Sequence, residues 1–144
     1  MGKWIRSFMT RDVFIDTSAF IALLNKKDDF HSQAAQMLQT ASRQQTHFIT
    51  TDYILDETLT LLKARGCGHI VPVFIDLIFH TRACQVIWMD SERFSKVTAF
   101  FQKYQDKQWS FTDCFSFVCM KEFRISRALT KDHHFSQAGF DLAE

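Results

Sequence analysis

Residues 13–18 read VFIDTS, and they give the clearest indication of the fold class. Three consecutive apolar residues that end at Asp16 predict a short β-strand. Thr17 or Ser18 is suited to cap a helix, which we expect to run to Leu24. A strand that passes directly into a helix is the first half of a strand–helix–strand unit, in which the next strand pairs in parallel. The start of the chain therefore predicts an α/β fold.

The alternation of strand and helix continues along the rest of the chain. Apolar residues at helical spacing mark the helices, and Gly and Pro mark several of their ends. The predicted helices are 30–41, 52–64, 72–80, 92–104 (capped by Ser91) and 111–123, and the predicted strands are 47–50, 85–89 and 127–130, with a turn and a short edge strand within 135–142. Strands separated by helices imply parallel pairing with right-handed crossovers. We expect a single-domain α/β/α sandwich with a central parallel sheet.

The length and composition fit one globular domain. The chain has 144 residues, of which 47% are hydrophobic and 23% charged, and its 4 Gly and 1 Pro leave little room for flexible linkers. We expect residues 1–12 to be an N-terminal extension and residues 13–144 to form the domain. The first residues contain no long apolar segment, and no run of about 18 apolar residues predicts a membrane span. The sequence thus predicts a cytoplasmic protein.

The net charge of +1 excludes a strongly basic nucleic-acid binder. Any binding of RNA would have to rely on local basic patches or on metal ions. The candidate patches are Lys26 with Lys27, Lys63 with Arg65, and Lys121 with Arg124 and Arg127. Clusters of this size more often solvate a surface than bind a partner. The cysteines, Cys67, Cys84, Cys114 and Cys119, form no C-x-x-C pair, which argues against zinc and favours reduced thiols.

Three aspartates are placed where chemistry would gather in a parallel sheet. The carboxyl ends of the strands meet along one edge, and ligands bind there. Asp16 ends the first strand, and Asp132 follows the strand 127–130 by two residues. Asp113 lies in the first turn of its helix if Ser110 or Thr112 is the N-cap, and there the helix dipole favours a carboxylate.

A fourth acid lies on the helix 52–64, and helical periodicity barely separates Asp56 from Glu57. The longer Glu57 side chain is better suited to reach a site from within a helix. Carboxylates gathered at one end of a sheet repel each other unless a cation lies among them. Mg²⁺ and Mn²⁺ prefer such oxygen ligands, and they activate water and orient phosphates. Each acid taken alone is more often a turn or cap residue, so only the set favours a metal site.

Four segments of this sequence resemble the motifs of a known family. Residues 13–18, 50–58, 109–114 and 128–135 are similar, in this order, to the four motifs of the PIN-domain family. Their acids fall on Asp16, Glu57, Asp113 and Asp132. The resemblance runs from about residue 13 to residue 141. It implies a compact α/β/α sandwich and a Mg²⁺- or Mn²⁺-dependent endoribonuclease that hydrolyses phosphodiester bonds.

The resemblance also implies roles for individual residues and for partners. Asp16 and Asp113 would bind the metal ion with support from Glu57 and Asp132, and Thr17 and Thr112 would orient the carboxylates. The small single-domain form resembles the VapC toxins of type II toxin–antitoxin pairs. Their implied partners are an RNA substrate, a cognate antitoxin and a second copy of the toxin.

Other functions share some of these residues. A stand-alone RNA-processing nuclease would need the same four acids, and a non-catalytic RNA-binding domain would not need them. A phosphoryl-accepting receiver domain is loosely suggested by Asp16, Asp90 and Lys131, but it requires paired acids at the first strand end. A phosphatase of the haloacid dehalogenase type would require a second aspartate at the position of Ser18.

The histidines beside Asp132 are a further candidate for the site. His133 and His134 could act as a general base or contact a phosphate. Loop histidines are more often surface residues, and we expect both to be so.

Overall fold

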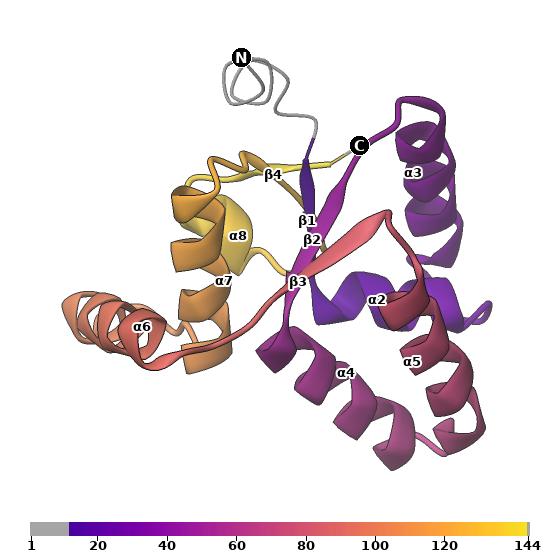
Figure 1. The fold of residues 1–144 in the computed structure, drawn as a ribbon, viewed down its shortest axis with the longest axis horizontal. Helices are drawn as coiled ribbons and strands as arrows, with labels where there is room; N and C mark the ends of the chain where they lie inside the picture. Colours follow the sequence, from indigo (N-terminus) through magenta and orange to yellow (C-terminus); the bar gives the residue numbers. More distant parts are fainter. Residues whose placement is uncertain (1–11, 144) are drawn as a thin grey trace.

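The sheet at the centre of the molecule has five parallel strands. The computed structural model describes residues 12–143, so residues 1–11 of the expected extension lie outside it. The strands are β1 (Val13–Ile15), β2 (Phe48–Thr51), β3 (Cys84–Ile87), β4 (Arg127–Leu129) and β5 (Asp141–Leu142), in the spatial order β3-β2-β1-β4-β5. Figure 1 shows the sheet between two groups of helices. The expected parallel sheet is confirmed.

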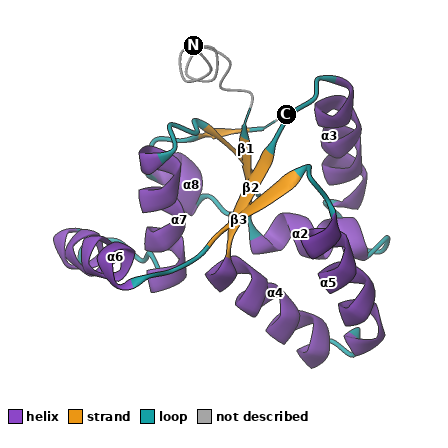
Figure 2. Ribbon diagram, in the orientation of Figure 1, coloured by secondary structure: helices purple, strands orange, loops and turns teal. Residues whose placement is uncertain are grey.

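Helices cover both faces of this sheet. They are α2 (Thr17–Leu24), α3 (His31–Arg43), α4 (Asp52–Ala64), the short 3₁₀ helix η1 (Gly68–Ile70), α5 (Val71–His80), α6 (Ser91–Lys103), α7 (Phe111–Glu122) and α8 (His134–Gln137). In Figure 2, α2, α3 and α5 lie on one side of the strands and α6, α7 and α8 on the other, while α4 extends from the end of β2. This arrangement is the predicted α/β/α sandwich.

Two helices begin one residue earlier than their predicted caps imply. Asp16, and not Thr17 or Ser18, occupies the N-cap of α2 with extended backbone (φ −92°, ψ 163°), and its carboxylate makes no capping bond. Asp90, and not Ser91, caps α6, because its carboxylate accepts a 2.7 Å hydrogen bond from the backbone N–H of Arg93. The Asp16 carboxylate therefore does not act as the cap of its own helix.

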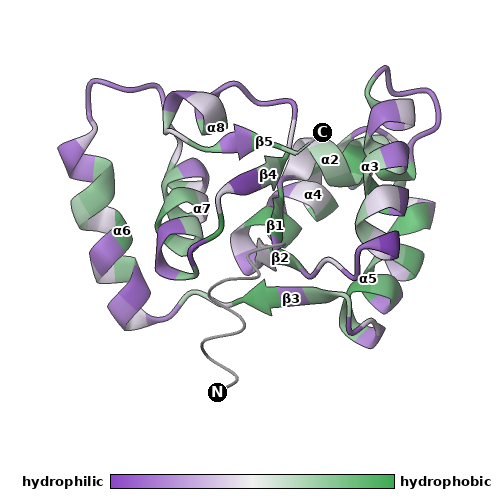
Figure 3. Cartoon of the chain, turned by 90° about the horizontal axis from the view of Figure 1, so that it is seen from above, coloured by the Kyte–Doolittle hydropathy of each residue, from purple (hydrophilic) through white to green (hydrophobic). Residues whose placement is uncertain are grey.

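Both the strand β1 and the helix α5 are rich in hydrophobic residues, as Figure 3 shows, but their burial differs. The residues of β1 are buried, whereas α5 leaves Val73, Leu77 and Phe79 exposed. Within the described residues, no helix has both the length and the hydropathy that crossing a membrane requires. The four cysteines carry free thiols, and Cys114 and Cys119 are buried.

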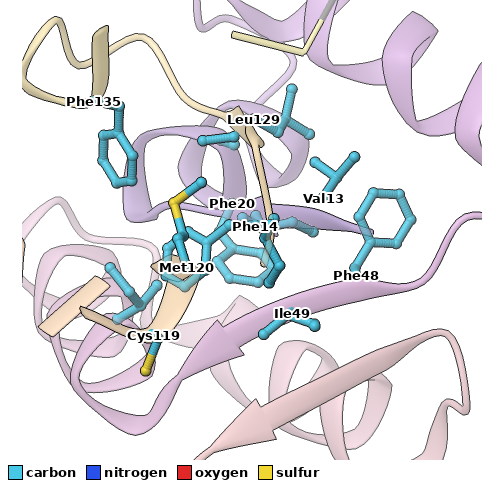
Figure 4. Packing of buried hydrophobic residues seen from close by; sticks show 14 of the residues in the cluster. Val13, Phe14, Phe20, Phe48, Ile49, Cys119, Met120, Leu129 and Phe135 are labelled. Carbon is cyan, nitrogen blue, oxygen red and sulfur yellow. The ribbon is translucent and has the colours of Figure 1, made fainter. Parts of the chain in front are cut away.

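The central strand β1 fixes where the site lies. Phe14 is fully buried and pairs with Ile49 of β2 on one side and Ala128 of β4 on the other. Its ring lies 6.0 Å from that of Phe135, and both belong to the core shown in Figure 4. A strand that is covered on both faces reads as a continuous apolar run, which explains the segment 13–15. Because β1 is held on both sides, Asp16 is fixed at the carboxyl end of the sheet.

Candidate active site

The four predicted acids meet in one cleft at the carboxyl edge of the sheet. Asp16, Glu57, Asp113 and Asp132 all line a cavity of about 190 Å³. They come from different parts of the chain: the end of β1, α4, the start of α7 and the loop after β4. The remaining lining residues are Thr17, Ser18, Ile21, Asp28, Leu61, Arg65 and Lys131. The topology thus brings together side chains that are up to 116 residues apart, counted from Asp16 to Asp132.

Asp16 is the most deeply buried of the four acids, with 7% of its surface exposed. Its Oδ2 atom accepts hydrogen bonds from the hydroxyls of Thr130 (2.8 Å) and Ser18 (3.1 Å). Burial raises the pKa of Asp16, and the hydrogen bond from Thr130 opposes that rise. A buried carboxylate is costly unless it is paired, and two hydroxyls supply no positive charge. The site therefore favours a cation next to Asp16.

Asp113 is held by a capping box at the start of α7. Its backbone N–H donates to Ser110 Oγ at 3.0 Å, and its Oδ2 accepts from the Ser110 backbone N–H at 3.0 Å. Burial raises the pKa of Asp113, and the charge of Asp132 raises it further. Ser110 therefore orients this carboxylate. The Thr112 carbonyl accepts from Ser116 Oγ, and within residues 12–143 the Thr112 hydroxyl makes no hydrogen bond to the four acids.

Glu57, and not its neighbour Asp56, lines the cleft. The side chain is exposed at the cleft mouth, yet partial desolvation raises the pKa of Glu57, and the charges of Asp16 and Asp113 add to the rise. A hydrogen bond with Thr17 lowers the same pKa. Three of the four carboxylates thus have a raised pKa, mainly because they are withdrawn from water, and the charges of neighbouring carboxylates add to the rise.

His134 contradicts the expectation that both histidines of the fourth segment are surface residues. Its Nδ1 atom lies 3.2 Å from Asp113 Oδ2 and 3.2 Å from Asp132 Oδ1. Nδ1 is buried and faces both carboxylates without hydrogen-bond geometry to either oxygen. Asp132 Oδ1 also accepts the His134 backbone N–H at 3.0 Å. His133, in contrast, is exposed.

The cationic side chains that line the cleft differ in how far nearby acids compensate their charge. Lys131 Nζ is shared by Asp28 at 3.6 Å and Asp29 at 3.5 Å, which compensates its charge. Arg65, the C-cap residue of α4, also lines the cleft. The donor atoms of Asp132, His133 and His134 also lie within 4.8 Å of one another. The cleft is thus dominated by hard oxygen donors, the ligands that Mg²⁺ and Mn²⁺ prefer.

Comparison with known proteins assigns the chain to a family. The family described as "PIN domain" matches residues 13–141. The protein named "23S rRNA-specific endonuclease VapC20" from Mycobacterium tuberculosis is 31% identical over 128 residues, which cover 89% of this chain and 95% of that protein. A "VapC ribonuclease" from Archaeoglobus fulgidus is 28% identical over 124 residues, covering 85% and 78%.

A solved structure agrees with these sequence matches. The crystal structure of Mycobacterium tuberculosis VapC20, described as a sarcin-ricin loop cleaving toxin, superposes with a TM-score of 0.79. The sequences are 29% identical in that superposition, which covers 89% of this chain and 95% of the other. The resemblance seen in the four acidic segments is therefore confirmed over nearly the whole chain. This chain belongs to the PIN domain family.

Proposed function

We propose that this protein is a metal-dependent endoribonuclease, the toxin of a type II toxin–antitoxin pair. The observation that carries the proposal is the convergence of Asp16, Glu57, Asp113 and Asp132 in one cleft. Membership of the PIN domain family and the likeness to proteins named VapC support it. Residues 13–144 would form the catalytic domain, with residues 1–12 as an extension to it. The reaction would take place in the cytoplasm.

Asp16 and Asp113 would hold the metal ion, Mg²⁺ or Mn²⁺, with support from Glu57 and Asp132. The donor set fits, because it consists of carboxylate oxygens and because the hydroxyls of Thr130 and Ser18 give the buried Asp16 no compensating positive charge. When bound, such an ion lowers the pKa of a water and stabilises the leaving oxygen of a phosphodiester.

The remaining work is done by side chains that fix the carboxylates. Thr130, which follows β4, and Ser18 of α2 hold Asp16, and Ser110 holds Asp113 at the start of α7. Groups of this kind keep the carboxylates in place before the substrate arrives. These hydrogen bonds also keep the carboxylates close together in the folded protein, although their charges repel each other.

Internal cutting of RNA tests the proposal. A covalently closed circular RNA is incubated with the protein and Mg²⁺ or Mn²⁺, and the products are separated on a denaturing gel. We expect the circle to be linearised, since an endonuclease needs no free end. A circle that stays intact while a linear RNA of the same sequence is degraded from its ends would contradict endonucleolytic cutting. The VapC20 proteins are named for 23S rRNA, so 23S rRNA is the first natural substrate to test.

Replacing His134 by alanine is expected to lower the cleavage rate by roughly 10- to 100-fold, the usual cost of losing a group that supports metal ligands. The reason is that His134 Nδ1 lies 3.2 Å from both Asp113 and Asp132 and holds them near each other. Initial rates on one labelled RNA measure the effect. The matched control is His133→Ala, which alters an exposed histidine one residue away. Equal rates for the two variants would remove His134 from the site.

A second copy of the chain is proposed to pack on α5. Val73 and Leu77, which are four residues apart and share one face of the helix, form an exposed apolar ridge there. Beside it, an apolar hollow of about 780 Å³ lies between α3 and α5, with Leu38 and Leu77 in its walls. A ridge next to a hollow suits a two-fold pair, in which each copy offers both surfaces to the other. Exposed apolar patches of this kind mark interaction sites more often than free surface.

The variant Leu77→Glu is expected to be a monomer where the unaltered protein is a dimer. A buried carboxylate in an apolar interface has no partner, and its desolvation opposes association. Light scattering coupled to size exclusion gives the mass of each species. Leu142→Glu, on the exposed edge strand β5, is the control and should stay dimeric. An unaltered protein that elutes as a monomer at high concentration would refute the α5 interface.

The antitoxin is proposed as the second protein partner. Its identity is tested by co-expressing the product of the neighbouring small gene and measuring RNA cleavage by the complex. We expect cleavage to fall in proportion to the amount of that product. Full cleavage in a stable complex would contradict an inhibitory role.

A further inference from the structure

One ridge of α4 leads from the acidic cluster to a basic residue. Glu57, Leu61 and Arg65 are spaced four apart and all line the cleft. Residues at this spacing share one face of a helix. Arg65 therefore lies about 12 Å along the helix axis from Glu57. Its backbone N–H still donates to the Leu61 carbonyl at 3.0 Å, so the last turn of α4 fixes its position.

Among the described residues, Arg65 differs from Lys131, the other cation that lines the cleft, in having no acidic partner. Lys131 is shared by Asp28 and Asp29, as described above. Within residues 12–143, no carboxylate forms an ion pair with Arg65, and its side chain makes no hydrogen bond. The side chain is exposed. A solvated guanidinium at the end of an acidic cleft is thus available to bind an anion from outside the chain.

We propose that Arg65 binds a phosphate of the RNA backbone next to the one that is cut, and that it thereby sets the position of the strand in the cleft. This inference rests on the proposed ribonuclease function. The acids of the cleft repel every phosphate that a metal ion does not neutralise, so a neighbouring phosphate needs a cation of its own. The guanidinium group matches phosphate oxygens with two parallel hydrogen bonds. The net charge of +1 offers no general basic field in place of this contact.

Steady-state cleavage of one fluorescently labelled single-stranded RNA tests the contact at several salt concentrations. Arg65→Ala is expected to raise KM by roughly 10-fold, in line with the loss of one charge-assisted hydrogen bond, while kcat changes little. The slope of log(kcat/KM) against log[salt] should become shallower by about 0.7, the value for one phosphate on a single strand. The KM of Arg65→Lys should lie between those of the unaltered protein and Arg65→Ala, since lysine keeps the charge but not the paired hydrogen bonds.

The matched control is Lys63→Ala, which removes an exposed cation from the last turn of the same helix outside the cleft lining. It should leave KM and the salt slope unchanged. Equal behaviour of Arg65→Ala and Lys63→Ala would overturn the inference. A lower kcat with an unchanged salt slope would also overturn it, because it would indicate a structural role for Arg65.

Replacement of single RNA phosphates by neutral methylphosphonates locates the contact. For the unaltered protein, one substitution beside the cut should raise KM, and Arg65→Ala should be insensitive to that same substitution. Sensitivity that is identical in both proteins at every position would refute the contact.

Binding of the same RNA, followed by fluorescence anisotropy, separates this inference from the proposed function. Failure to cut RNA with any divalent ion would refute the nuclease, whereas weaker and less salt-dependent binding by Arg65→Ala would still support the phosphate contact. If Arg65→Ala binds as tightly as the unaltered protein, or if neither binds, the contact is refuted as well.

Discussion

Replacing Asp16 by asparagine is expected to lower the rate of RNA cleavage by roughly 10³-fold, with the fold retained. The charge stabilisation that a metal ion gives to a phosphodiester is worth several kcal/mol, and each ~1.4 kcal/mol is a factor of ten in rate. Asn keeps an oxygen that can accept the hydrogen bonds from Thr130 and Ser18, and it removes a buried charge. The measurement is the initial rate on one labelled RNA at saturating Mg²⁺ or Mn²⁺.

The control for this loss is Asp56→Asn. Asp56 is an exposed acid beside Glu57 that does not line the cleft, so its replacement removes the same charge from the chain without touching the cluster. Its rate should equal that of the unaltered protein. A folded Asp16→Asn variant that cuts RNA at the normal rate would show that Asp16 holds no essential metal ion.

Removing a second acid of the cleft is expected to increase the stability of the fold when no metal ion is bound. In a chelator at pH 7, Asp113→Asn is expected to melt a few degrees higher than the unaltered protein. Burial and the charge of Asp132 raise the pKa of Asp113, so the ionised form is disfavoured in the folded state. A carboxyl group with a raised pKa stabilises the fold below its unfolded pKa, and this contribution is lost as pH rises through the folded pKa. The difference in melting temperature between the variant and the unaltered protein should therefore shrink as the pH is lowered.

With added Mg²⁺ or Mn²⁺, the unaltered protein is expected to melt at a higher temperature than Asp113→Asn. An ion that binds only the folded state stabilises it in proportion to the logarithm of its concentration, and the variant has lost one ligand. Differential scanning fluorimetry with and without the ion gives both midpoints, at about 3 °C per kcal/mol for a domain of this size. A chelated variant that melts lower than the unaltered protein would indicate that Asp113 mainly supports its capping box with Ser110.

The sequence predicted the elements better than their arrangement. The apolar run 13–15 identified β1, because a strand buried on both faces needs apolar residues at every position. The order β3-β2-β1-β4-β5 was not predicted, since the composition of a strand does not determine which strands pair with it. The caps at Asp16 and Asp90 were missed, because a run of adjacent capping residues leaves the boundary open by one position.

The acids of the cleft were accessible to sequence reasoning, and several of their neighbours were not. Asp16 and Asp132 could be placed from the strand ends alone. Helical periodicity barely separated Glu57 from Asp56, so the choice of Glu57 depended on its side-chain length and on the motif resemblance, and the fold places Glu57 in the cleft. His133 and His134 look alike in the sequence, and the turn at Asp132 buries only the second.

Two further neighbours of the acids depended on tertiary structure. Ser110 was one of two candidate caps with Thr112, and its role in holding Asp113 follows from both of its hydrogen bonds. Arg65 was one of several basic residues until α4 placed it in the cleft.

Cleavage of total RNA by the purified protein in Mg²⁺ or Mn²⁺ tests the metal-dependent ribonuclease most directly. A chelator control and the variant Asp113→Asn are measured beside it. A metal-dependent ribonuclease built on the four acids should cut RNA only with the ion present, and the variant should leave the RNA intact. Cleavage that persists in the chelator, or that is equal in the variant, would contradict the role assigned to the acidic cleft. No cleavage by a folded protein with either ion would contradict the ribonuclease itself.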